Sequence, residues 1–133
     1  MEAKVRELSR YRFNKAEKSL LISKKLFEEG EYGYSQNRAY YALFDAIRSV
    51  TVLDNFDSSK HSGIIAYFNQ HYVKTGLFDQ KTSAVIRLAS MLREKSDYED
   101  FYEPDGDDTQ NIIESITEFL KDVKSFLCGK EVF

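Results

Sequence analysis

Hydrophobic residues recur at every third or fourth position along most of the chain, which is the spacing of a buried stripe on an α-helix. Gly30 is a suitable residue to end the first helix, and Ser35 is a suitable N-cap for the second. A single proline and six glycines leave few helix breakers. The pattern predicts an antiparallel, up-and-down, all-α bundle of four long helices and one short helix, formed by a single domain over residues 1–133. The predicted helices cover residues 9–29, 35–54, 61–72, 79–98 and, after a cap at Asp108 or Thr109, about 109–128.

The second predicted helix carries more polar groups than a core helix needs. Positions 40, 43, 44, 47 and 50 form its apolar stripe. Asn37, Tyr41, Asp45 and Arg48 lie at the same three-to-four spacing on a strip beside it, so their side chains are neighbours. We therefore predict a scaffold helix with one polar edge.

Composition narrows the class of protein. Lys and Arg number 19 against 22 Asp and Glu, for a formal charge of −3, which argues against a general nucleic-acid coat protein but allows a small basic patch. Cys128 is the only cysteine and is expected to pack in the last turn of the final helix. The charged N-terminus, the absence of a disulfide pair and the absence of a long apolar run predict a cytoplasmic protein without a membrane partner.

The histidines and acidic residues lack the spacing of a metal site, so we expect neither a metal nor a cofactor. His61 and His71 have no ligand partners at helical spacing. The acidic segment 105–108 does not fit a calcium loop. Two interpretations stay open for the segment around Lys60 and His61: an anion site at a helix start, or a surface histidine behind a Ser59 cap, which the pattern favours.

Arg93 and Asp97 also allow two interpretations. Their four-residue spacing favours a surface ion pair, worth only about 0.3–0.5 kcal/mol. Alternatively, Arg93 turns inward at the edge of its apolar face and holds a phosphate through two hydrogen bonds, with Asp97 or Tyr98 near a sugar hydroxyl.

Three segments, together with Arg93 and the following Ser96–Tyr98, resemble prokaryotic HEPN-domain proteins over nearly the whole chain. They are NRAYYALFDAIR (37–48), KHSGII (60–65) and YVKTG (72–76). The resemblance implies a helical bundle that forms a homodimer. It also implies a minimal nucleotidyltransferase partner, as in a toxin–antitoxin pair.

Many HEPN proteins resemble metal-independent ribonucleases, whose signature is an Arg followed, after four to six residues, by a His. Arg93 matches the Arg, but the permitted histidine positions hold Tyr98, Glu99 and Asp100. The resemblance thus implies a degenerate motif in a protein that binds a nucleotide or RNA phosphate near Arg93. Two alternatives remain: an active ribonuclease that uses His61 or Asp97 as its acid or base, and a purely structural partner of a nucleotidyltransferase. The candidate catalytic residues are Arg93, Asp97 and Tyr98, and the candidate ligand-binding residues are Asn37, Tyr41, Lys60 and His61.

Overall fold

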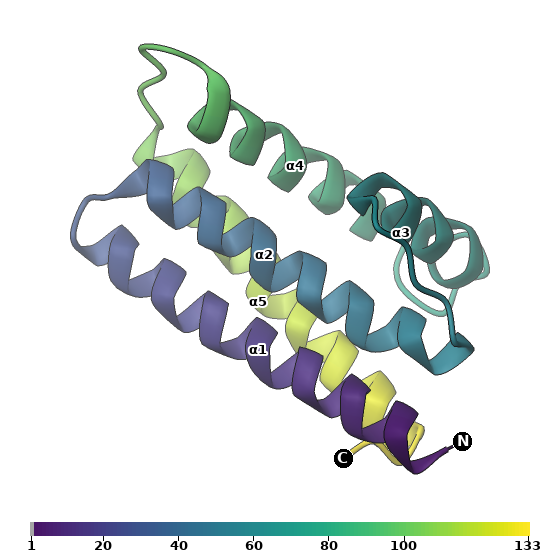
Figure 1. Cartoon of the computed structure of the whole chain (residues 1–133). Coiled ribbons are helices and arrows are strands. Elements are labelled where there is room, and N and C mark those ends of the chain that lie inside the picture. The colour runs from purple at the N-terminus through teal and green to yellow at the C-terminus, as the bar shows by residue number, and fades with distance from the viewer. Residues whose placement is uncertain (1) are drawn as a thin grey trace.

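A computed structural model describes residues 2–133, and this range contains helices and no strands (Figure 1). A 3₁₀ turn (Val52–Asp54) follows α2, and a short π-helix (Asn69–Val73) extends α3. The predicted all-α helical bundle is therefore confirmed. Its α-helices are α1 (Ala3–Glu28), α2 (Tyr32–Thr51), α3 (His61–Phe68), α4 (Thr82–Tyr98) and α5 (Gly106–Gly129).

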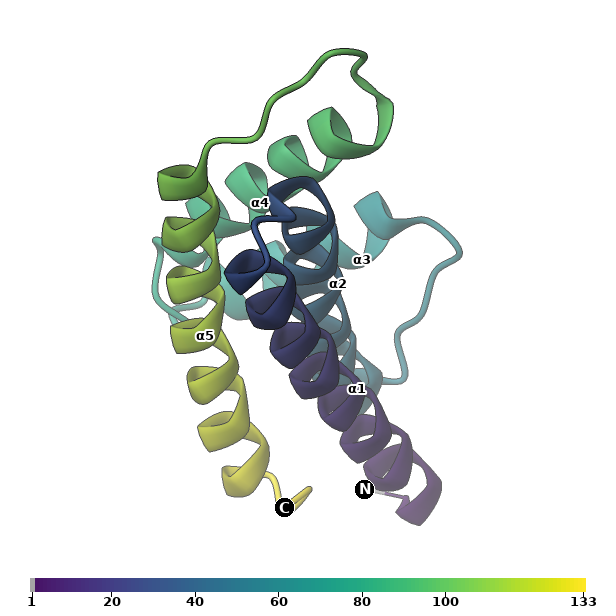
Figure 2. The ribbon, with the colours of Figure 1, turned by 90° about the vertical axis from the view of Figure 1, so that its left-hand side faces the viewer.

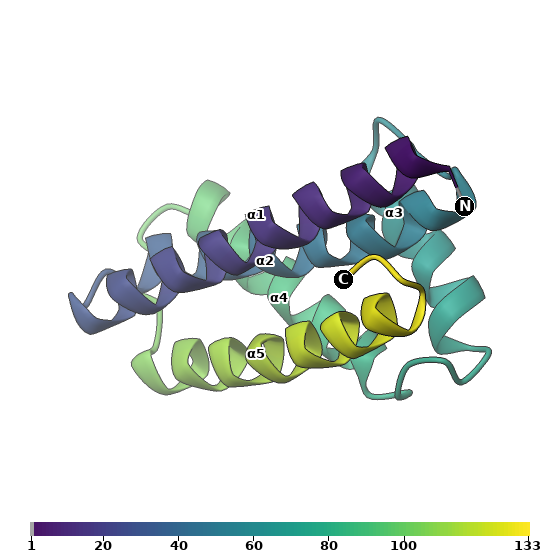
Figure 3. The ribbon, with the colours of Figure 1, turned by 90° about the horizontal axis from the view of Figure 1, so that it is seen from below.

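Helix α2 occupies the centre of the bundle, because it alone contacts each of the other four α-helices. It runs antiparallel to α1, with α5 packed against this pair (Figures 1 and 3). The turned view in Figure 2 shows α4 and α3 on the other side of α2, and both ends of the chain at one end of the bundle. A functional group on the α2 edge between α1 and α4 can thus meet side chains from several elements.

The predicted α2 stripe is confirmed. Tyr40, Leu43, Phe44, Ile47 and Val50 are all at most 5 % exposed. Three alanines next to these residues are fully buried, which brings neighbouring helices close to the α2 backbone. These alanines are Ala39, Ala42 and Ala46.

Ser35 is not an N-cap, because α2 begins at Tyr32 and Ser35 lies inside it. The hydroxyl of Ser35 donates to the Ser23 carbonyl at 2.8 Å, and the Ser23 hydroxyl donates to the Ser35 carbonyl at 2.7 Å. Both serines are completely buried. The small hydroxyl therefore joins α1 to α2 instead of capping a helix, a use that local sequence does not distinguish from a cap.

Other predicted helix ends are also shifted. Helix α1 begins at Ala3, and α4 begins at Thr82. Helix α5 is capped by Asp105, whose carboxylate accepts from the Asp107 N–H at 3.0 Å, and not by the predicted Asp108 or Thr109. Cys128 lies in the last turn of α5 as predicted, but the expectation that it packs there is wrong. It is exposed, because it lies about 100° around the helix from buried Leu127.

A pair of ionic contacts fixes the loop that leads into α3. One carboxylate oxygen of Asp57 lies 3.3 Å from Arg12 Nη2, and the other lies 3.6 Å from Arg48 Nη2. Burial opposes the charge on Asp57, but the Ser58 N–H and the two arginines outweigh it and lower the Asp57 pKa. Asp57 thereby ties the start of α3 to α1 and α2.

Candidate phosphate-binding site

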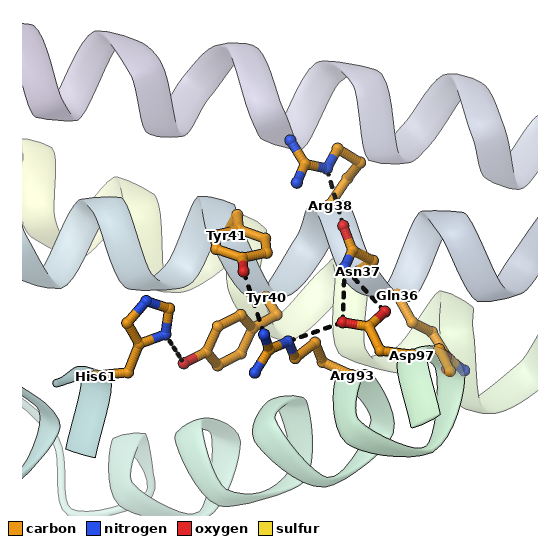
Figure 4. A network of polar contacts seen from close by, with 9 residues as sticks. Gln36, Asn37, Arg38, Tyr40, Tyr41, His61, Arg93 and Asp97 are labelled. Atoms are coloured by element: carbon orange, nitrogen blue, oxygen red, sulfur yellow. Dashed lines mark hydrogen bonds and ion pairs between the residues drawn. The ribbon is translucent and has the colours of Figure 1, made fainter. Parts of the chain in front are cut away.

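Arg93 extends from α4 toward α2, where aromatic and acidic groups surround it (Figure 4). Its Nη2 donates to the Tyr41 hydroxyl at 3.2 Å, and its Nε lies 3.1 Å from Oδ2 of Asp97. Its guanidinium carbon also lies 5.1 Å from the centre of the Tyr40 ring. The side chain is 19 % exposed, so the predicted Arg93–Asp97 ion pair forms, but with the arginine turned partly inward.

Asn37 holds Asp97 from the facing helix. Its Nδ2 donates to both carboxylate oxygens, at 3.0 and 3.1 Å, and its Oδ1 accepts from Arg38 Nε at 3.1 Å. Four of the predicted residues are therefore brought together across the α2–α4 contact: Asn37, Tyr41, Arg93 and Asp97 (Figure 4).

The guanidinium of Arg93 keeps its charge and retains donors for a ligand. Burial alone would lower the Arg93 pKa, but Tyr41 and Asp97 outweigh burial and raise it. The buried Nε–H does not point along a hydrogen bond to Asp97, despite their short distance. Within residues 2–133, no group accepts a hydrogen bond from Nη1. A planar cation with an available donor is suited to a phosphate or a carboxylate.

His61, the first residue of α3, lies on the other side of Tyr40 from Arg93 (Figure 4). Its Nδ1 is 3.0 Å from the Tyr40 hydroxyl, and its ring stacks on Phe44 with 3.9 Å between centroids. Burial, followed by the charges of Arg93 and Arg48, lowers the pKa of His61. The lowered pKa favours a neutral imidazole at pH 7. His61 is partly exposed, but its ring is held by Tyr40 and Phe44 and is not free on the surface.

Comparison with known proteins identifies the family. The HEPN domain matches residues 9–126. The chain belongs to the HEPN family.

Its HEPN relatives include two proteins of Methanocaldococcus jannaschii that are named "Putative toxin". One is 28 % identical over 96 % of this chain and 86 % of its own length, and the other is 30 % identical over 84 % and 83 %. A "UPF0332 protein" of Archaeoglobus fulgidus is 34 % identical over 86 % of this chain and 90 % of its own length. The resemblance inferred from the sequence is therefore confirmed.

Two predicted residues of this HEPN protein remain outside the hydrogen-bonded cluster. Tyr98 is 75 % exposed, and its ring centre lies 5.9 Å from the guanidinium carbon of Arg93. Lys60 is exposed at the N-cap of α3, where its N–H donates to Ser58 Oγ at 3.2 Å. No side chain caps the start of α3, so the expected Ser59 cap is not formed.

The sequence did not identify Gln36 as part of the site. Gln36 is 1 % exposed, donates to Thr109 Oγ1 at 2.9 Å and accepts from the Ser96 hydroxyl at 2.7 Å and from the Tyr102 hydroxyl at 3.3 Å. It thereby fixes the last turn of α4, which carries Asp97. A polar residue four positions before Tyr40 on the apolar stripe was the available signal.

Tyr40, which belongs to the predicted apolar stripe, also links His61 to the environment of Arg93. Burial, partly opposed by Arg93, raises the pKa of Tyr40 to about 12. Its hydroxyl therefore remains protonated at neutral pH and can donate to His61 Nδ1.

The acidic and imidazole groups of the described residues 2–133 include no set of three that could hold a metal ion. In the same range, no helix is long and apolar enough to cross a membrane.

Proposed function

We propose that this HEPN protein binds the phosphate of a nucleotide or of RNA at Arg93, as the toxin-like member of a pair with a nucleotidyltransferase-type protein. The observation that carries the proposal is the guanidinium of Arg93, held by Tyr41 and Asp97 with Nη1 left for a ligand. Names of the Methanocaldococcus relatives support the toxin-like assignment.

A ribonuclease motif that keeps its arginine but lacks its histidine is better suited to binding a phosphate than to cleaving an RNA strand. The positions where an HEPN ribonuclease would carry its histidine hold Tyr98, Glu99 and Asp100. Tyr98 is exposed, and none of the three supplies an imidazole. Arg93 is then a binding residue, with Asn37 and Tyr41 fixing its surroundings.

The test compares two arginines of α4. Arg93→Ala should weaken binding of adenosine monophosphate and of a short oligoribonucleotide by roughly ten- to a hundredfold, because charge-assisted hydrogen bonds contribute about 1.5–3 kcal/mol. Arg87→Ala is the matched control, because Arg87 is exposed on the same helix and its substitution removes the same charge. Calorimetry on the purified variants measures both affinities. Equal losses in the two variants would contradict a specific site at Arg93.

The partner and the assembly need separate measurements. We expect this chain to co-purify with a nucleotidyltransferase-type protein and to sediment alone as a homodimer, at twice the 15.5 kDa mass of one chain. A tight complex that survives Arg93→Ala, combined with no nucleotide binding by the wild type, would instead favour the purely structural subunit.

One observation supports a second candidate, a metal-independent ribonuclease with a non-standard base. His61 carries a neutral imidazole whose Nδ1 is hydrogen-bonded to Tyr40, on the other side of Tyr40 from Arg93 (Figure 4). In the tautomer whose Nδ1–H donates to the Tyr40 oxygen, Nε2 is the basic nitrogen and would take the proton of a ribose 2′-hydroxyl. The resulting oxygen would attack the adjacent phosphorus. The bond from phosphorus to the 5′-oxygen would break, and water would protonate the departing oxygen while Arg93 stabilises the phosphorane charge.

This reaction yields a 2′,3′-cyclic phosphate and a 5′-hydroxyl, and it cannot occur on an oligonucleotide with a 2′-deoxy residue at the cut. Cleavage lost in His61→Asn but retained in His71→Asn would establish the ribonuclease. Growth arrest and RNA cleavage that depend on Arg93 would have the same meaning in cells. Intact RNA with wild-type protein, together with nucleotide binding, would reject it in favour of the first candidate.

A further inference from the structure

A pocket of about 320 Å³ adjoins the contacts around Arg93 through Asp97, which lines the pocket and also pairs with Arg93. Three elements form its walls: the turn from α1 into α2 (Gly30–Tyr34), the last turn of α4 (Ser96 and Asp97) and the loop before α5 (Tyr102 and Pro104). Its volume lies at the lower end of the range of small-molecule sites, about 300–1,000 Å³. The pocket therefore suits a group the size of a ring system.

Aromatic rings supply the apolar part of this pocket. Tyr32 and Tyr102 are held in place, the first against Phe27 at 5.4 Å between ring centroids and the second by its hydrogen bond to Gln36. Tyr34 differs from them, because it is 69 % exposed at the pocket. A base can stack on such a ring whatever its identity, since every base has a π-face.

The charges of the lining residues favour the base and ribose of a nucleotide in this pocket and its phosphate at Arg93. The pocket is lined by the carboxylates of Glu31 and Asp97 and by no Lys or Arg, so it repels an anion. A carboxylate has about four acceptor positions, and the two hydrogen bonds from Asn37 leave positions of Asp97 for a ligand. Amino groups of a base and hydroxyls of a ribose are donors that suit these acceptors. The phosphate, in contrast, is attracted to Arg93.

We propose that this pocket holds the base and ribose of a nucleotide whose phosphate binds Arg93. The proposal rests on the proposed function, because it requires the phosphate to be bound at Arg93. It adds a specificity site formed by the α1–α2 turn and the α4–α5 loop, with Tyr34 as the stacking residue and Asp97 between base and phosphate. The ligand is a free nucleotide or the terminal nucleotide of an RNA strand.

Gly33 allows a test that changes the pocket by one methyl group. A Cβ at this position would lie 3.5 Å from Pro104 Cγ and 4.0 Å from Ser96 Oγ, on the facing walls. Gly33→Ala therefore narrows the pocket without a clash, and its position inside α2 favours alanine over glycine. The variant should fold at least as well as the wild type, which a thermal melt checks.

The experiment measures three ligands by calorimetry: adenosine monophosphate, ribose 5-phosphate and inorganic phosphate. We expect the wild type to bind adenosine monophosphate roughly tenfold tighter than ribose 5-phosphate, because the base adds a stacking contact. Gly33→Ala and Tyr34→Ala should both abolish that preference. Tyr34→Ala should leave the affinity for ribose 5-phosphate unchanged, because Tyr34 is the stacking residue for the base. Tyr11→Ala is the control, since Tyr11 is a comparably exposed tyrosine on α1, at 63 %. It should keep the preference.

The outcomes separate this inference from the proposed function. Equal affinity of the wild type for adenosine monophosphate and ribose 5-phosphate, with both lost in Arg93→Ala, would overturn the base pocket alone. Failure of all three ligands to bind would overturn the proposed function and the pocket with it. Tighter binding of a short oligoribonucleotide than of adenosine monophosphate, lowered by Gly33→Ala, would support the pocket with an RNA terminus as its source. Equal or weaker oligonucleotide binding, with the base preference intact, would support it with a free nucleotide.

Discussion

Two groups of tyrosine and histidine side chains in this bundle differ in the sign of the charge at their centre. The Arg93 cluster consists of Tyr40, Tyr41, His61, Arg93 and Asp97. The Asp54 cluster consists of Asp54, Tyr67, His71 and Tyr72. In the second cluster, the tyrosine hydroxyls donate to one carboxylate oxygen of Asp54, at 3.1 Å from Tyr67 and 2.7 Å from Tyr72.

The central charge decides what each cluster can bind. Two phenols already occupy one oxygen of Asp54, and burial together with this carboxylate raises the pKa of Tyr72. A pocket of about 400 Å³ borders the Asp54 cluster, and an anion entering it would meet the Asp54 carboxylate as well as the Lys130 ammonium. Arg93 offers the opposite charge and an available N–H. Similar side chains therefore surround a cation, the proposed anion site, in one place and a hydrogen-bonded carboxylate in the other.

The largest expected difference between the clusters concerns the aromatic ring beneath each. Phe44, under His61, is 5 % exposed in the core, and Phe44→Ala should lower the free energy of unfolding by about 3–5 kcal/mol. Phe56, which stacks on Tyr67 at 4.0 Å, is only partly buried, and Phe56→Ala should cost about 1–2 kcal/mol. Urea unfolding followed by far-UV circular dichroism measures both. Equal losses in the free energy of unfolding would show that the ring beneath the Arg93 cluster contributes no more to stability than the ring beneath the Asp54 cluster.

A smaller difference is expected for the tyrosine hydroxyls. Tyr72→Phe removes a hydrogen bond to a carboxylate and should destabilise the protein by about 1.5 kcal/mol, whereas Tyr40→Phe removes one to a neutral imidazole and should cost about 0.5–1 kcal/mol. Both losses are measured by the same unfolding experiment.

The tyrosines also give a dependence on alkaline pH. The pKa of Tyr40 is about 12 in the folded protein, against 10 as its ordinary value. Because the unfolded chain releases this proton first, stability falls as the pH rises from 10 towards 12. Tyr40→Phe should reduce that fall. An unchanged alkaline profile would contradict the burial of a neutral Tyr40 hydroxyl.

The smallest expected effect is on the protonation of His61. Burial, Arg93 and Arg48 lower its pKa, so the folded state binds fewer protons than the unfolded state and stability falls as the pH drops below 6.5. Arg93→Ala removes one of these charges and should move the His61 pKa upward, with a smaller loss of stability in acid. Titration of the imidazole by NMR measures the shift. A His61 pKa that does not respond to Arg93→Ala would place the two groups in separate environments.

Local patterns in the sequence predicted the helices well and their ends less well. The apolar residues of α2 and α5 recur clearly at every third or fourth position, which is sufficient for a helix prediction. Ahead of Ser9, α1 continues through charged residues with little apolar periodicity, so nothing marked its start at Ala3. At Ser35 a side chain that resembles a cap instead satisfies a backbone carbonyl of α1.

The site was predicted in part, and for two different reasons. The Arg93–Asp97 pair follows from spacing along one helix, so sequence alone could propose it. The Asn37–Asp97 contact joins residues 60 positions apart, and the sequence could place them together only through the family resemblance. The direction of His61 depends on tertiary contacts with Tyr40 and Phe44, which no local pattern specifies.

The ion pairs of Asp57 predict that substitutions outside the site also impair function. Its carboxylate retains 54 % exposure and belongs to none of the proposed ligand contacts, yet its pairs with Arg12 and Arg48 hold the chain that delivers His61. A library selected for loss of function should therefore recover positions 12 and 57 together with the site residues. Such variants would keep an intact bundle and a normal Arg93. The set of loss-of-function positions would then include residues that do not contact the ligand.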